Sequence, residues 1–105
     1  MAENWQHVAS MSDLEEDEPF RVRVDDTQIA LCRLGDEVFA IDNICTHDYA
    51  ELSDGFIEGD CIECPLHQAQ FDIRTGKALT APAVEDLATY PCRVDGDDVL
   101  VDMGS

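Results

Sequence analysis

The hydrophobic pattern divides the first half of the chain into strands separated by turn signals. Apolar residues alternate with polar ones over 20–25, which is the period of a half-buried β-strand. Residues 28–34 are mostly apolar and predict a second strand that is covered on both faces. Gly35 and Asp36 form a hairpin signal, and residues 37–42 predict the strand that follows it.

The strand pattern returns after Pro82. Apolar and polar positions alternate over 90–95, and Pro91 within this run predicts an edge strand or a bulge, because proline cannot donate to a sheet ladder. Asp95-Gly96 is a second hairpin signal, and the apolar residues 99–101 predict a closing strand. The chain therefore predicts an all-β fold of short antiparallel strands.

The middle of the chain, from about residue 43 to 82, interrupts this pattern. It contains turn residues, many acidic residues and only short apolar runs, of which 56–57 and 71–73 predict short strands. An insertion of about 35 residues is longer than a structureless connection inside a compact domain. We therefore expect one domain over 1–105, an antiparallel β base of about six strands with a small inserted β subdomain, and something that orders the insertion.

Charge limits the partners that the protein accepts. The chain has 105 residues, 24 of them acidic and 6 basic, which gives a formal charge of −18. This field repels phosphate backbones and anionic lipid, so nucleic acid and membranes are excluded as expected partners. A basic protein surface is favoured instead, and self-repulsion favours a monomer.

The five cysteines point to reduced thiols rather than to a disulfide framework, since their number is odd. They are Cys32, Cys45, Cys61, Cys64 and Cys92. The acidic start of the chain lacks a signal-peptide pattern, and no apolar run has the roughly 20 residues that span a bilayer. We expect a cytoplasmic protein, in which cysteines near histidines are more often metal ligands than disulfide halves.

Two short boxes combine a thiol with an imidazole. Cys45-Thr46-His47 is followed, after the sixteen residues 48–63, by Cys64-Pro65-Leu66-His67. If the two boxes meet, they present two sulfur and two nitrogen donors. This donor set suits either tetrahedral zinc or a two-iron, two-sulfide cluster with cysteines on one iron and histidines on the other.

The other cysteines and the third histidine have simpler interpretations. Cys61 and Cys64 form a C-x-x-C pair, which also suits zinc or thiol exchange, but no second pair completes a zinc ribbon. Cys61, Cys32 and Cys92 are interpreted as small buried hydrophobes, and His7 as a surface or packing residue. Five aromatic residues are expected in the core or at its margin: Trp5, Phe20, Phe39, Phe56 and Tyr90.

At the two boxes the sequence resembles the Rieske family, and more closely the small Rieske-type ferredoxins of bacterial ring-hydroxylating dioxygenase systems. Gln70-Phe71-Asp72, Thr75-Gly76 and the loop at Pro82 also resemble the family, and the likeness extends from the strand around Trp5 to the final strand. The resemblance implies a Rieske (ISP-like) fold, with the cluster-binding subdomain at about 43–82.

The resemblance also implies the ligands of one Rieske-type [2Fe-2S] cluster. Cys45 and Cys64 would bind the inner iron, and His47 and His67 the outer iron. Two thiolates leave the oxidised centre neutral, whereas four would leave it doubly negative, so histidine ligation raises the reduction potential.

Departures from the high-potential respiratory members predict a potential at the low end of the Rieske range. Ala50 and Leu66 occupy the places of the cysteines that form a bracing disulfide there, and Phe71 lacks the hydroxyl that a tyrosine would donate. With fewer hydrogen bonds to sulfur and a charge of −18, we expect about −150 mV.

The implied function is one-electron transfer from a flavin-dependent reductase to a terminal non-haem iron oxygenase in aromatic hydrocarbon catabolism. We do not expect a catalytic site, because hydroxylation needs a mononuclear iron held by two histidines and a carboxylate, and only His7 remains. Two alternatives stay open: a structural zinc module that binds a partner, and a small subunit of a larger reductase.

Overall fold

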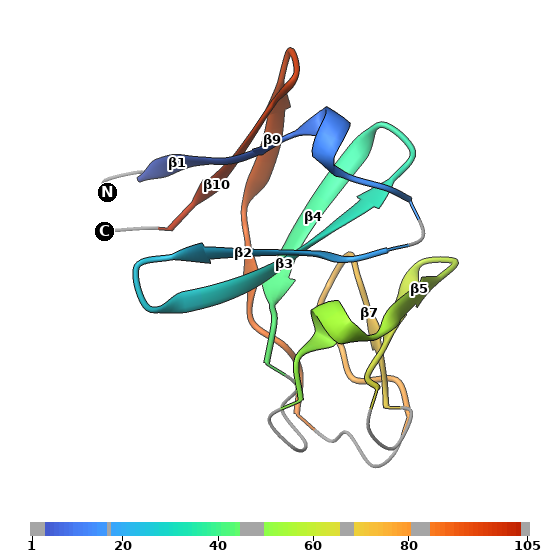
Figure 1. The fold of residues 1–105 in the computed structure, drawn as a ribbon. Helices are drawn as coiled ribbons and strands as arrows, with labels where there is room; N and C mark the ends of the chain where they lie inside the picture. Colours follow the sequence, from blue (N-terminus) through green and yellow to red (C-terminus); the bar gives the residue numbers. More distant parts are fainter. Residues whose placement is uncertain (1–3, 17, 45–49, 66–68, 81–84, 104–105) are drawn as a thin grey trace.

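The computed structural model describes residues 4–16, 18–44, 50–65, 69–80 and 85–103. In these segments the strands form three antiparallel sheets (Figure 1). The first sheet has the order β1 (Trp5–Ser10), β10 (Asp98–Asp102), β9 (Cys92–Asp95). The second has the order β2 (Phe20–Val24), β3 (Thr27–Leu34), β4 (Glu37–Asp42), β8 (Thr89–Tyr90). The third has the order β5 (Phe56–Glu58), β6 (Cys61–Glu63), β7 (Gln70–Asp72).

Two single-turn 3-10 helices join these strands: η1 (Met11–Asp13) after β1 and η2 (Leu52–Asp54) before β5. The predicted all-β class is therefore confirmed, as are the hairpins at 35–36 and 95–96. The third sheet lies between β4 and β8 in the chain, within the stretch where the strand pattern is interrupted.

The β2–β3–β4–β8 sheet is the middle layer of the molecule. Successive side chains of a strand point to opposite faces. Ile29 and Leu31 of β3 pack on one face with Val99 and Val101 of the first sheet. Ala30 and Cys32 point to the other face, where a second apolar cluster includes β5–β7 residues. The continuous apolar run over 28–34 is thereby explained, because both faces of β3 are covered.

The second apolar cluster joins the third sheet to the middle layer. Ile57, Ile62 and Phe71 occupy the inward row of β5, β6 and β7 and lie against Cys32 and Ile41. Phe71 and Ile62 are fully buried. We call this group the subdomain core; its buried members are Ala30, Cys32, Ile41, Leu52, Ile57, Ile62, Cys64, Ala69, Phe71, Ile73 and Leu87.

The base, expected to contain about six antiparallel strands, is divided into two sheets. Outside β5–β7 the described strands number seven and form two sheets, because the chain changes sheets at Pro91. β8 pairs with β4 up to Tyr90, whereas β9 pairs with β10 from Cys92 onward. Proline has no N–H with which to continue the first ladder, so the break falls at this residue.

Arg74 ties the inserted sheet to the β3–β4 hairpin. Its guanidinium contacts Glu37 at 3.3 Å and Asp60 at 3.9 Å, and it lies over the Phe39 ring at 5.0 Å from the centroid. Its backbone N–H donates to Asp72 Oδ1 at 2.8 Å. Arg74 therefore links two parts of the fold.

Gly76 supplies a first prediction about folding. Gly76 and Gly59 both have positive φ (+77° and +62°), but only at Gly76 would a Cβ overlap the Leu87 carbonyl oxygen and approach Thr89. Gly59→Ala is expected to lower the free energy of unfolding by about 1 kcal/mol through backbone strain alone. Gly76→Ala should lower it by about 2–4 kcal/mol, since overpacking is added. Equal losses in urea unfolding would contradict the close approach.

Candidate metal centre

Of the four predicted ligands, Cys64 is the one that lies in the described part of the chain. It directly follows β6, and its side chain is buried in the subdomain core, with 1% of its surface exposed. Cys45, His47 and His67 lie outside the described residues. The structure therefore defines the residues at the base of each loop that carries a box. We call these paired flanking residues the neck of the loop: Ile44 and Glu51 for the first box, Cys64 and Ala69 for the second.

Each neck is closed by backbone pairing. An antiparallel bridge joins Ile44 to Glu51 on either side of the first box. At the second box the Cys64 N–H donates to the Ala69 carbonyl at 2.7 Å. Ala50, Cys64 and Ala69 all contact the subdomain core, so both necks rest on the same apolar cluster at one end of the molecule (Figure 1).

Asn43 anchors the first neck. It is fully buried, and each of its polar groups has a partner. Its Nδ2 donates to Gln28 Oε1 and to Glu51 Oε1, both at 3.3 Å, and its Oδ1 accepts from the Ser53 N–H at 2.8 Å. Its backbone N–H donates to the Gln28 carbonyl at 3.0 Å, and its carbonyl accepts from the Leu52 N–H at 2.7 Å.

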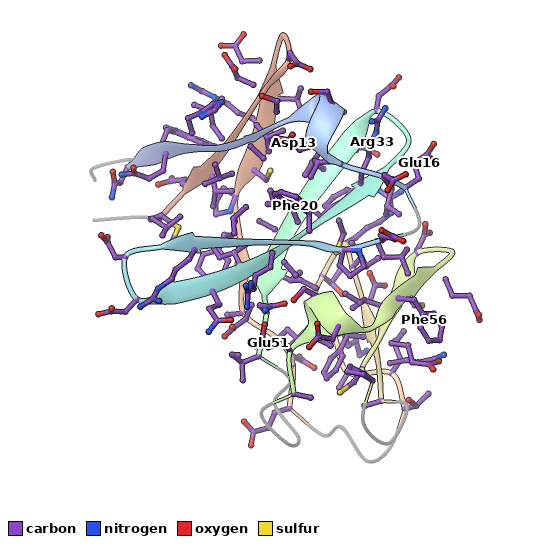
Figure 2. The ribbon with its side chains drawn as sticks, viewed as in Figure 1. Asp13, Glu16, Phe20, Arg33, Glu51 and Phe56 are labelled. Atoms are coloured by element: carbon purple, nitrogen blue, oxygen red, sulfur yellow. The ribbon has the colours of Figure 1, made fainter. Side chains whose placement is uncertain are left out.

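Glu51 extends this network to the surface of the base. Its Oε1 also accepts from Arg21 Nη1 at 2.9 Å, so one carboxylate oxygen joins β2 to the neck of the first loop. Figure 2 shows the Glu51 side chain close to where β4 ends. Hydrogen bonds to charged groups are worth more than neutral ones, so this shared carboxylate strengthens the anchor.

Cys61 points away from the site. It pairs with Asp72 in the ladder, next to the inward Ile62, so its thiol lies on the outer face of the third sheet. Partial burial raises the pKa of the Cys61 thiol, and the nearby carboxylates of Asp72, Asp60 and Glu58 raise it further. The C-x-x-C pair is therefore split between two faces, and the alternative that both cysteines bind one metal is disfavoured.

The prediction that three cysteines are small buried hydrophobes holds fully for Cys32 alone. Cys32 is fully buried, and burial raises its pKa to about 12. Cys92 is half-buried, with its pKa raised by burial to about 11. For Cys61 the prediction is wrong, because its strand has one open face. His7 is exposed and contacts Asp98 at 3.2 Å, as expected of a surface residue.

The described residues by themselves contain no group of three or more His, Cys, Asp or Glu side chains that is placed to hold a metal. The other three predicted ligands, Cys45, His47 and His67, lie in the stretches 45–49 and 66–68, outside the described residues. The buried Cys64 and the apolar cluster behind it fit a cluster of thiolate and imidazole ligands, because such a wall limits access of water.

Comparison with known proteins identifies the family. Residues 4–91 match the Rieske [2Fe-2S] domain. The ferredoxin component of a naphthalene 1,2-dioxygenase/salicylate 5-hydroxylase system from Ralstonia sp is 45% identical over 98% of this chain and 99% of its own length. The ferredoxin in a solved complex of reduced oxygenase and oxidized ferredoxin in carbazole 1,9a-dioxygenase is 35% identical, with a TM-score of 0.87 over 93% of this chain and 92% of that chain. The chain belongs to the Rieske [2Fe-2S] domain family.

The cofactor and general role follow from this membership. The protein carries one Rieske-type [2Fe-2S] cluster and works as an electron carrier, not as a catalytic subunit. The zinc alternative is thereby set aside. The small-subunit alternative has a structural counterpart, an NADH-dependent nitrite reductase small subunit assigned in Mycobacterium tuberculosis, with a TM-score of 0.88 over 100% of this chain and 99% of that chain. Its 25% identity is well below that of the dioxygenase ferredoxin.

None of the described segments forms a helix that is both long enough and apolar enough to cross a bilayer.

Sequence reasoning missed the residues that anchor the first neck. Asn43 stood only as the start of the insertion, and neither Glu51 nor Arg21 was distinguished from the solvated charges. One local signal was available: a polar side chain placed between an apolar strand and a ligand box, where asparagine is suited to bond nearby backbone. Its partners are distant in the sequence and needed the fold.

Cys61 and Cys64 provide a matched pair of variants for the site. Cys64→Ser should abolish cluster binding, because it removes a buried thiolate, whereas Cys61→Ser should leave the iron content and the visible spectrum unchanged. Both variants replace a cysteine sulfur with a hydroxyl oxygen, at positions three residues apart. Loss of the cluster in Cys61→Ser would contradict the separation of the two thiols onto different faces.

The anchor is tested by Asn43→Asp. The new carboxylate keeps the acceptor for Ser53 but removes the donor to Gln28 and Glu51 and places a second negative charge against Glu51. We expect a loss of at least about 2 kcal/mol in stability and faster cluster loss, followed as the decay of visible absorbance. Asn4→Asp, at an exposed position, is the control. Equal decay rates for the two variants would rule out the anchoring role.

Proposed function

We propose that Cys45 and Cys64 bind the inner iron of the cluster and that His47 and His67 bind the outer iron. This assignment is supported by the box pattern of the family, by the burial of Cys64 and by the closure of both necks on one apolar cluster. On the same grounds, residues 43–82 act as the cluster-binding subdomain within a single domain over 1–105.

The protein then passes single electrons from a flavin-dependent reductase to a terminal Rieske non-haem iron oxygenase that hydroxylates an aromatic ring. The observation that carries this proposal is the near full-length likeness to a dioxygenase ferredoxin component at 45% identity. The solved complex of a related ferredoxin with its oxygenase supports the acceptor. We further propose that it acts as a monomer in the cytoplasm, consistent with its charge of −18.

When bound, the cluster supplies the one-electron redox chemistry. The residues of this chain control how that electron is held. Neutral imidazoles in place of two thiolates favour the reduced state, while the acidic surface disfavours it. The buried side chains of Leu52, Ile62 and Phe71 form an apolar wall that limits water behind Cys64.

The decisive experiment is spectroscopic and kinetic. The purified protein should contain two irons and two sulfides per chain and give a rhombic electron-spin signal of low average g after reduction. With a ferredoxin reductase and a ring-hydroxylating oxygenase, it should support substrate oxidation that depends on its presence. A colourless protein with one zinc, or a reduced cluster that the oxygenase cannot reoxidise, would overturn the proposal.

The reduction potential of the cluster tests whether the predicted histidines are its ligands. We expect a midpoint reduction potential of about −150 mV, at the low end of the Rieske range. His47→Cys should lower it, because a thiolate adds negative charge to the cluster. His7→Cys makes the same replacement at the exposed surface of β1 and should leave it unchanged. An unchanged potential in a cluster-loaded His47→Cys protein would remove His47 from the ligands.

A further inference from the structure

The outer face of the third sheet carries a row of three residues that continues to a fourth residue on the chain segment after β7. Phe56 pairs with Glu63, and Glu63 pairs with Gln70. The bridge between Phe71 and Ala78 and the bond from the Leu79 N–H to the Gln70 carbonyl, 2.9 Å, extend the register to Leu79. Directly opposite residues share a face, so these four side chains form one line, here called the outer row. At usual strand spacing its ends are about 14 Å apart.

The two ends of the outer row are apolar and open to solvent. Phe56 is 47% exposed and Leu79 is 45% exposed, and within the described residues they are the large hydrophobic side chains classed as exposed. Figure 2 shows Phe56 at the margin of the molecule, beside β5. Phe56 was expected in the core or at its margin; it is instead exposed, because Ile57 takes the inward position of that strand.

At the centre of the outer row, the Glu63 carboxylate is a hydrogen-bond acceptor whose orientation is fixed by its neighbour. Gln70 Nε2 donates to Glu63 Oε1 at 3.0 Å, which orients the carboxylate between the two apolar ends. An acceptor held in this way suits an arginine or lysine of a partner. The row thus has an apolar anchor on each side of a fixed negative charge.

The surroundings of the outer row are acidic. Asp54 precedes Phe56 by two residues and is exposed, and the next row of the sheet contains Glu58 and Asp72, with Lys77 opposite Asp72. The partner must therefore bring positive charge around an apolar centre. Charge at the rim steers the encounter, whereas desolvated apolar anchors provide most of the affinity.

The outer row also adjoins the cluster site. Glu63 directly precedes Cys64, and Gln70 directly follows Ala69, whose carbonyl closes the neck of the second loop. A partner that covers this row therefore lies beside the loop that carries the second box. We propose that the outer row is a docking surface for the terminal oxygenase, which presents a basic side chain flanked by apolar ones. This inference rests on the proposed function.

The test separates docking from electron transfer itself. Phe56→Thr/Leu79→Thr replaces both anchors with a residue that suits strands. With ferredoxin reduced chemically, so that no reductase is present, the KM of the oxygenase for the ferredoxin should rise roughly tenfold, with kcat unchanged. The midpoint potential and visible spectrum should match those of the unaltered protein. Val24→Thr, at a half-buried valine beside the β2–β3 turn, is the control for the apolar-to-threonine change and should leave KM unchanged.

A second variant tests the centre of the row. Glu63→Gln should raise the same KM and weaken its dependence on salt, since one charge of the contact is removed. Asp97→Asn removes an equal charge in the turn between β9 and β10, which Figure 1 shows far from the third sheet, and should have little effect. If the double variant loses its cluster, the oxygenase KM of Glu63→Gln compared with that of Asp97→Asn decides whether the outer row is a docking surface.

Two results would overturn the inference. An oxygenase KM that is unchanged in cluster-loaded variants would show that the outer row is not a docking surface. A rise of the same size in the KM of the reductase for the oxidised ferredoxin would contradict the assignment to the oxygenase. Failure of the unaltered protein to reduce the oxygenase would instead overturn the proposed function, so the two failures are distinguishable.

Discussion

Closure of two loops at their necks is the constraint on which the rest of this structure depends. A centre built from two distant boxes forms only if both loops start from fixed positions close to each other. The Cys64 N–H closes one neck, and the buried Asn43 closes the other through five hydrogen bonds. In a buried setting each of these bonds is costly to lose, so the starting positions of the loops are held firmly.

The layered core explains why both necks lie at the same end. The middle sheet buries one face against β1, β9 and β10 and the other against the inserted sheet, so the insertion is packed rather than loose. Arg74 adds a polar tie between the insertion and the base. The described residues that flank both boxes thus rest on the packed core of a small domain.

Electrostatics act on two scales in this protein. At the cluster, imidazole ligands reduce the negative charge and favour uptake of an electron, while the overall charge of −18 opposes it. At the surface, the same acidity selects basic partners, but charge alone does not fix where they dock. The outer row gives that surface a definite place, because Phe56 and Leu79 interrupt the acidic surroundings with apolar anchors.

The sequence by itself determined the strand class, the hairpins and the sulfur and nitrogen donors that the two boxes offer, because side-chain periodicity and residue identity are local properties. It did not determine which side of a strand is covered. Cys61 was expected to be buried and Phe56 to lie in the core or at its margin, yet both lie on the open face of the third sheet. The burial of Asn43 and the change of sheet at Pro91 were likewise decided by the tertiary structure. The physical reason is the same in each case: burial depends on which distant segment packs against a residue, and no local pattern contains that partner.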